Sequence, residues 1–252
     1  MPKKLVPCPG RGNRILHLTP PIARSRFTFG RPTSGGPSGM GAGRPGYDEK
    51  LVAILRAAAV VFAEKGYHQA SIRDISRATG VSLSGLYYYV RSKEELLFLI
   101  QDHCFGTVLE NVERLLEGET DPVRRLRLFV ENHVRFFVNN MREMKVLSHE
   151  ADSLSGEYRR RVQAKKKKYT DLCMSILEEL RPVDSRIDPR VATFALFGML
   201  NWIYNWYHPG RDVPVAELAD GFSRLFLQGC LSPASGAAEA MPGEPTPSIW
   251  RH

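Results

Sequence analysis

Apolar residues recur every three or four positions over most of the chain, and this spacing is typical of amphipathic helices. The first such stretch covers residues 47–66 and has its apolar positions at Leu51, Ile54, Leu55, Ala58 and Phe62. No run of strand length alternates between apolar and polar residues, and no hairpin dipeptide joins two apolar segments. The pattern therefore predicts an all-α protein of about nine helices.

Two short helices joined by a tight turn are predicted within residues 71–90. Ser71 is a favourable N-cap residue, and Asp74 stands where it can complete a capping box. Gly80 can adopt the positive φ that a sharp turn needs, and Ser82 or Ser84 caps the next helix. The residues expected to face a small core are Ile72, Ile75, Ala78, Val81 and Leu86. This arrangement describes a helix-turn-helix, whose second helix enters the major groove of DNA.

The second of these helices carries three consecutive tyrosines, Tyr87, Tyr88 and Tyr89. Successive residues on a helix point about 100° apart, so all three cannot face the core. We expect Tyr89 to pack inward, whereas the other two rings lie on the sugar-phosphate chain and donate their hydroxyls to it. Lys93 begins the following helix, where its charge is expected to meet phosphate. The predicted DNA contacts are Ser71, Arg73, Ser82, Ser84, Gly85, Tyr87, Tyr88 and Lys93.

The segment "ILRAAAVVFAEKGYHQASIRDISRATGVSLSGLYYYVRSKEELL" resembles the DNA-binding domain of the TetR/AcrR family of bacterial transcriptional regulators. The resemblance covers about residues 48–108. Val90 departs from the family pattern, which usually has Phe there, and this is a change in the core. The resemblance implies a homodimer that binds a palindromic double-stranded operator. It also implies a C-terminal domain that takes a small-molecule effector and thereby releases the DNA.

Composition and charge divide the rest of the chain. The net charge of +8 arises from an acid-free leader, because the chain beyond residue 46 balances 27 basic against 27 acidic residues. DNA binding is therefore inferred from a local site and not from bulk charge. The leader is expected to be disordered. Three interpretations of it stay open: a basic arm that adds affinity for phosphate, a segment resembling a transit peptide, or sequence upstream of a translation start at Met40. The expected segments are a leader at 1–47, a DNA-binding domain at 48–108, an effector and dimerisation domain at 109–232, and a disordered tail at 233–252.

The stretch "RVATFALFGMLNWIYNWYHPG" (190–210) is apolar nearly all round, which predicts a helix buried on two sides. One side is expected to pack on the protein's own core and the other on a second subunit; a purely internal helix is the alternative. The last helix has Leu218, Phe222, Leu225 and Phe226 at helical spacing. Together the two helices predict half of a four-helix dimer bundle. The predicted interface residues are Trp206, Phe222, Leu225 and Phe226.

Two features point to an acyl-CoA effector. The stretch "LNWIYNWYHPGRDVPVAELADGFSRLFLQGCL" resembles the family's acyl-CoA-responsive repressors of fatty-acid and sterol catabolism. In addition, Lys165 and Lys166 interrupt the apolar line of the helix at 156–180, which is costly unless they meet an anion or solvent. A basic entrance above an apolar interior suits phosphates and an acyl chain. The alternative is a solvated run of charges. The predicted ligand residues are Phe136, Phe137, Leu147, Arg161, Lys165, Lys166, Tyr169, Phe194, Asn201 and Trp202.

Other classes of function find little support. The chain has no GxSxG, P-loop or GxGxxG motif, and its four cysteines form no CxxC pair, so we expect neither catalytic residues nor a metal site nor a cofactor. His103, His133 and His149 are isolated and are interpreted as packing or surface residues. No apolar run is long enough for a membrane span, and the expected location is the cytoplasm. The remaining alternatives are a regulator of another apolar effector such as a drug or steroid, an interaction module without a ligand, and an all-α enzyme. The sequence leaves open whether the regulator represses or activates.

Overall fold

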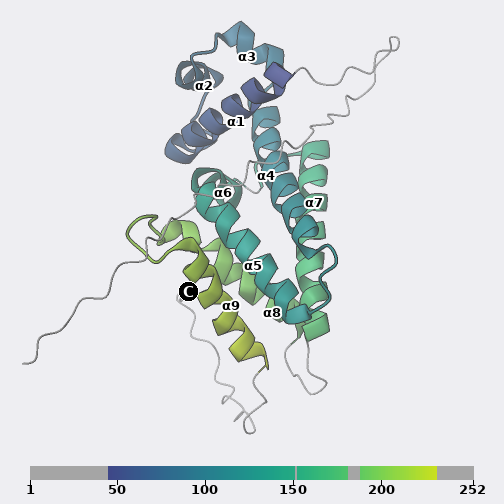
Figure 1. Ribbon diagram of the computed structural model, residues 1–252. Helices are drawn as coiled ribbons and strands as arrows, with labels where there is room; N and C mark the ends of the chain where they lie inside the picture. The colour runs from purple at the N-terminus through teal and green to yellow at the C-terminus, as the bar shows by residue number, and fades with distance from the viewer. Residues whose placement is uncertain (1–44, 151, 181–187, 232–252) are drawn as a thin grey trace, which may run out of the picture. The chain divides into compact units, whose positions relative to one another are not determined.

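The computed structural model describes residues 45–150, 152–180 and 188–231, and the described residues contain helices and no strand (Figure 1). The all-α prediction is therefore confirmed. The elements are α1 (Pro45–Lys65), α2 (Ile72–Thr79), α3 (Leu83–Tyr89), α4 (Lys93–Leu116), α5 (Pro122–Asn139), α6 (Met141–His149), α7 (Gly156–Leu180), α8 (Pro189–Asn201), the 3-10 helix η1 (Ile203–Asn205) and α9 (Val215–Leu231).

The predicted leader and tail lie outside the described residues, except for 45–47, which begin α1. None of the described helices combines the length and the apolar character needed to cross a membrane.

The first core forms where α1, α2 and α3 pack around the N-terminal half of α4. Its fully buried side chains include Ile54 and Phe62 of α1, Ile75 of α2 and Leu86 of α3. Val90, the departure from the family pattern, is also buried in this core. Burial of these side chains supplies the apolar free energy that stabilises α2 and α3, which are too short to be stable in isolation.

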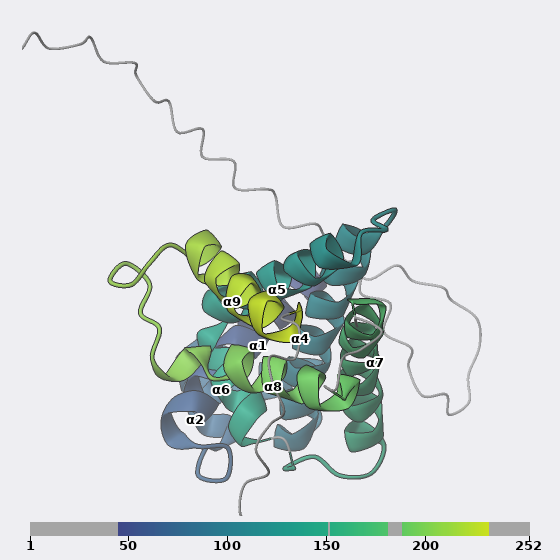
Figure 2. The same cartoon turned by 90° about the horizontal axis from the view of Figure 1, so that it is seen from below.

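The second core lies among α4, α5, α7, α8 and α9, and α8 and α9 lie side by side (Figure 2). Helix α4 belongs to both cores, because Leu96–Ile100 pack in the first and Val108, Leu109 and Val112 pack in the second. The predicted domain boundary at residues 108 and 109 therefore falls inside one continuous helix.

The single helix predicted over 190–210 is wrong in its extent. Helix α8 ends at Asn201, and the chain then forms η1 and a turn. Ile203 and Tyr207 are both buried after this break, and the Tyr207 hydroxyl donates to the Val213 carbonyl at 2.8 Å. The break changes the direction of the side chains after Asn201, so one periodicity cannot describe both segments.

Candidate functional site

Local hydrogen bonds set the geometry of the helix-turn-helix. Ser71 caps α2 and forms a complete capping box with Asp74, as predicted. Gly80 adopts the left-handed conformation with φ of 67°, which ends α2 and turns the chain. Ser82, rather than Ser84, caps α3 by accepting a hydrogen bond from the Gly85 amide at 3.1 Å.

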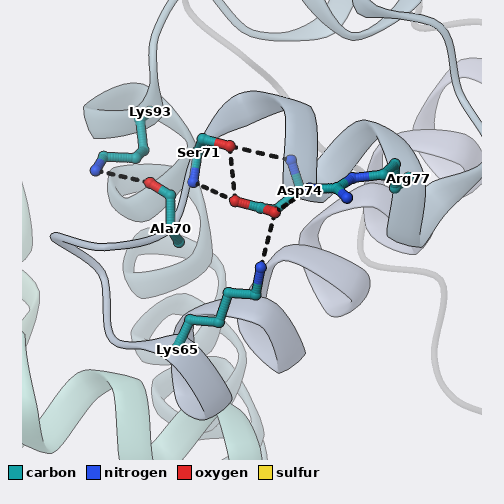
Figure 3. Close-up of polar contacts among 6 residues, drawn as sticks. All are labelled: Lys65, Ala70, Ser71, Asp74, Arg77 and Lys93. Carbon is teal, nitrogen blue, oxygen red and sulfur yellow. Dashed lines mark hydrogen bonds and ion pairs between the residues drawn. The ribbon is translucent and has the colours of Figure 1, made fainter.

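The Asp74 carboxylate joins α2 to the end of α1 (Figure 3). One oxygen accepts from Lys65 Nζ at 2.7 Å and from Arg77 at 2.6 Å, while the other accepts from the Ser71 amide at 2.9 Å and from its hydroxyl at 2.6 Å. The hydrogen bonds from Lys65 and then Ser71 hold the pKa of Asp74 well below its ordinary value. The carboxylate is thus charged at neutral pH and fixes the position of α2 on α1.

Helix α3 presents two of its three tyrosines to solvent. The exposed fractions are 54% for Tyr87 and 72% for Tyr88, whereas Tyr89 packs against the first core. This confirms the predicted orientation of all three rings. Ser71, Arg73, Ser82 and Ser84 are also exposed. Leu83, at the start of α3, is 37% exposed beside them and was not among the predicted contacts.

Two predicted positions in this region have a different role in the structure. Ala78 is exposed, so its predicted place in the core is wrong; Ile75 and Leu86 fill that space. Gly85 was predicted to contact DNA, and a Cβ there would lie 2.9 Å from the Val81 Cγ1 atom. Any side chain would have to displace Val81, so the packing of α3 on the turn favours glycine even without DNA.

Lys93 does not present a free charge. Its ammonium nitrogen lies 2.9, 3.2 and 3.0 Å from the carbonyl oxygens of Tyr67, His68 and Ala70 (Figure 3 shows the last of these). It also lies 4.5 Å from the centre of the Tyr67 ring. Three carbonyls use the three donors of an ammonium group. The structure thus gives Lys93 the task of holding the loop between α1 and α2, in place of the predicted phosphate contact.

The basic face of α7, residues 159–168, is largely paired within the chain. Lys165 forms an ion pair with Asp102 of α4 at 2.7 Å and donates to the Asp102 carbonyl at 2.9 Å. Lys166 lies over the Phe105 ring at 5.1 Å, and burial lowers its pKa. Arg161 is exposed and covers the Phe98 ring at 4.8 Å. Lys165 therefore fastens α7 to α4, and Lys166 and Arg161 are the cations that border the aromatic side chains of α4.

An aromatic cluster lies among α5, α7 and α8. Tyr169 is buried and stacks on Phe129 at 4.7 Å, and Phe197 approaches Tyr169 at 5.9 Å. The cluster also contains His133, whose ring stacks on Phe137 at 4.1 Å. Phe136 and Phe137 are partly buried beside it, whereas Leu147 belongs to the first core.

His133 was not predicted as a site residue, because a single histidine on a helical pattern has no distinguishing sequence signal. It is only 2% exposed, and burial lowers its pKa to about 3. Its Nδ1 atom lies 3.2 Å from the Tyr169 hydroxyl, while its Nε2 atom has no hydrogen-bond partner. Such an atom in a native core calls for an explanation.

The outer surface of α8, η1 and α9 carries an apolar strip, which we define as Val191, Phe194, Trp202, Trp206 and Leu225. Their exposed fractions range from 42% for Trp206 to 67% for Leu225. Phe194 and Trp202 are thus on the surface, so their predicted place in the ligand pocket is wrong. Phe226 is 7% exposed and belongs to the core, so its predicted place in the dimer interface is wrong too. Phe222 is partly buried against Trp206.

Polar contacts connect the loop between α6 and α7 to the helix-turn-helix region. Glu150 accepts from the Tyr67 amide at 3.3 Å, and its carbonyl accepts from the Gln101 side chain at 3.1 Å. Glu94 of α4 accepts from both the amide and the hydroxyl of Ser155, at 2.8 and 2.7 Å. A shift of α6 or α7 would therefore be transmitted to α4 and to the loop that precedes α2.

A surface hollow of about 430 Å³ opens between the C-terminal end of α4, α5 and α7. Its lining is mostly charged: Glu113, Arg114, Leu116, Glu117, Arg125 and Leu172. No predicted ligand residue is among them. Within the described ranges, no group of His, Cys, Asp and Glu side chains is arranged to hold a metal ion.

Comparisons with known proteins match both halves of the chain. Residues 54–100 match the family described as "Bacterial regulatory proteins, tetR family", and residues 119–230 match "Tetracyclin repressor-like, C-terminal domain". The fold is similar to that of AibR in complex with isovaleryl coenzyme A and operator DNA, with a TM-score of 0.63 and 30% identity over 70% of this chain and 97% of AibR.

Two curated relatives extend the similarity. The fatty acid metabolism regulator protein of Bacillus subtilis (strain 168) is 23% identical over 184 residues, which are 71% of this chain and 95% of the relative. The transcriptional activator FasR of Mycolicibacterium smegmatis is 28% identical over 153 residues, or 61% of this chain and 68% of FasR.

Proposed function

We propose that this chain, which belongs to the TetR family of bacterial transcriptional regulators, binds a palindromic operator as a homodimer. We further propose that an acyl-CoA thioester sets its affinity for this DNA. The chain is thus a DNA-binding regulator and not an enzyme. The observation that carries the proposal is the surface of α3, where Tyr87 and Tyr88 are exposed on a helix whose position is fixed by caps on both sides of the turn.

The DNA contact is assigned to the exposed side of α3. A tyrosine ring covers apolar sugar atoms, and its hydroxyl donates to a phosphate oxygen. Ser82, Ser84 and Arg73 lie on exposed positions around the same turn and are proposed to add phosphate contacts. Lys93 and Gly85 are left out of this set, because both have structural roles inside the chain.

The DNA contact is tested by deleting one hydroxyl. Tyr88→Phe should weaken binding of a palindrome from upstream of the gene by about tenfold, because a hydrogen bond to a charged oxygen is lost. Tyr204→Phe is the matched control, since it removes a hydroxyl from η1, outside the helix-turn-helix. Fluorescence anisotropy measures both. If the two variants bind DNA as tightly as the wild type, the tyrosine face of α3 is not the contact.

The apolar strip is the proposed dimer interface. Five large apolar side chains on neighbouring helices are more than scattered surface residues, and a twofold axis would bury each against its counterpart. Leu225→Glu should give a monomer and abolish tight operator binding, because two half-sites must be bound together. Ala216→Glu is the control, as Ala216 is exposed on the opposite side of α9. Sedimentation measures the oligomeric state of the wild type and both variants. A monomeric wild type would contradict the proposal.

The effector is proposed to be an acyl-CoA thioester. The aromatic cluster offers an apolar place for the acyl chain, and Lys166 and Arg161, which lie over the α4 rings of Phe105 and Phe98, offer cations for phosphates. In addition, AibR was crystallised with isovaleryl coenzyme A and operator DNA. A ligand that favours one arrangement of α4 changes operator affinity by about 5–150-fold on the usual scale of such linkage.

The effector is tested with a panel. Operator affinity is measured with CoA thioesters of short, medium and long chains, with the matching free acids, and with a steroid. Thioesters alone should release the DNA. Lys166→Gln combined with Arg161→Gln should weaken this response, whereas Lys167→Gln should not, because Lys167 pairs with Asp171 on the exposed side. Lys165 is left intact, since its loss would detach α7 from α4. A response to free acids or to the steroid alone would refute the thioester.

A further inference from the structure

The unpartnered nitrogen of His133 lies in the aromatic cluster proposed to hold the acyl chain. The imidazole is enclosed by Phe137 at 4.1 Å, Phe197 at 5.8 Å and Tyr169 at 5.9 Å between ring centres. Phe137 and Phe197 are only partly buried, whereas His133 and Tyr169 are buried. The polar contact between His133 Nδ1 and the Tyr169 hydroxyl occupies one nitrogen of the ring and leaves the other.

One contact of His133 bears on which nitrogen carries its hydrogen. Its Nδ1 atom lies 3.2 Å from the Tyr169 hydroxyl. With the hydroxyl as the donor of this contact, Nδ1 accepts and the neutral ring carries its hydrogen on Nε2. In that form Nε2 is a buried donor without an acceptor.

We propose that Nε2–H of His133 donates to an uncharged carbonyl oxygen of the effector and so selects an acyl thioester over a thioether or a free acid. This inference rests on the proposed function, because it assigns a residue to the thioester of the acyl-CoA. A carbonyl supplies the missing acceptor, whereas a thioether leaves the donor unpaired. A carboxylate would bring a negative charge among uncharged rings, and a neutral imidazole does not compensate for it.

Asn201 is a polar neighbour of the imidazole. It is exposed at the end of α8, and its side chain favours the charged form of His133 as a hydrogen-bonding group, although Nε2 has no partner at hydrogen-bond distance and angle. The effector carbonyl would take the place of this side chain beside the ring.

The test compares paired ligands that differ only at the carbonyl. Butanoyl-, octanoyl- and dodecanoyl-CoA are compared with S-butyl-, S-octyl- and S-dodecyl-CoA, and binding to the full-length dimer is measured by calorimetry. The wild type should bind at least one thioester about tenfold more tightly than its thioether. His133→Phe should bind the two equally. His133→Gln, which keeps an N–H donor, should retain part of the preference.

Two further readouts keep the outcome decisive. Nitrogen-15 spectra of the ring should show hydrogen on Nε2, and Tyr169→Phe should reduce the preference because the hydroxyl that selects this form is gone. If the wild type binds thioester and thioether equally while both release DNA, the role of His133 is overturned and the acyl-CoA effector stands. In that case Nε2 binds an ordered water only. If no thioester of any length binds, both proposals fail.

Discussion

The burial of His133 makes the stability of the protein depend on pH in a way that the structure specifies. The pKa of His133 is about 3 in the folded chain, because its charged form is desolvated, and an unfolded histidine titrates near about 6.5. Between these values the unfolded chain binds a proton that the folded chain does not. The stability is therefore fully present above about pH 6.5 and falls as the pH is lowered toward about 3.

The size of this effect follows from the linkage. Each pH unit in that interval costs about 1.4 kcal/mol for one proton. At pH 5 the wild type should thus have lost about 2 kcal/mol of unfolding free energy through His133, compared with pH 8. Urea unfolding followed by tryptophan fluorescence measures this loss. The protein concentration is held fixed, because the stability of the proposed dimer would depend on it.

The comparison is made with His133→Gln, whose side chain is neutral throughout. All other titrating groups are shared, so the difference between the two pH curves isolates His133. The variant should lose about 2 kcal/mol less than the wild type between pH 8 and pH 5. Phe137→Leu is the control, because it removes the stacked ring and lowers stability at every pH without a titrating group. Parallel curves for the wild type and His133→Gln would refute the burial of a neutral imidazole.

Three further predictions concern the DNA-binding half. Lys93→Met should lower the unfolding free energy by about 2 kcal/mol, because its ammonium group donates to three carbonyls, and it should leave the salt dependence of operator binding unchanged. If the slope of log affinity against log salt concentration became smaller by about one unit, Lys93 would contact a phosphate after all. Glu150→Ala, which removes the acceptor for the Tyr67 amide, should leave operator affinity without effector intact and shrink the effector-induced change, measured by anisotropy; an unchanged response would exclude this loop from the transmission. Because the pKa of Asp74 is lowered in the folded chain, its contacts are fully present above about pH 4 and are lost as the pH falls through that lowered pKa. Hydrogen exchange of the α2 amides should therefore become faster at low pH in the wild type, and this pH dependence should be absent in Asp74→Asn.

The parts of the site that depend on local sequence were predictable. Ser71, Asp74 and Gly80 act within a few residues of their own positions, so capping rules identify them. The outward direction of Tyr87 and Tyr88 follows from helical periodicity alone. These features required no knowledge of the tertiary structure.

The parts that depend on distant partners were not predictable. Lys93 meets carbonyls 23 to 26 positions away, and Lys165 meets Asp102 across 63 positions, so neither partner is visible in the local pattern. Leu225 and Phe226 are adjacent apolar residues, and only the packing of α9 on α5 decides which one is exposed. The burial of His133 requires three helices to meet, which a single helical pattern cannot reveal.

The continuity of α4 sets a condition on hybrid regulators assembled from two relatives. Its 24 residues contribute Leu96–Ile100 to one core and Val108–Val112 to the other, with no loop in between where a splice would be harmless. A junction within this helix forces each half to pack against residues selected for a different partner. With the DNA contact proposed above, exchanging the operator specificity requires replacing only the exposed side chains of α2 and α3. An exchange of whole domains would instead have to transfer the first-core face of α4 together with the new helix-turn-helix. It would also have to preserve the contact between Glu94 and Ser155.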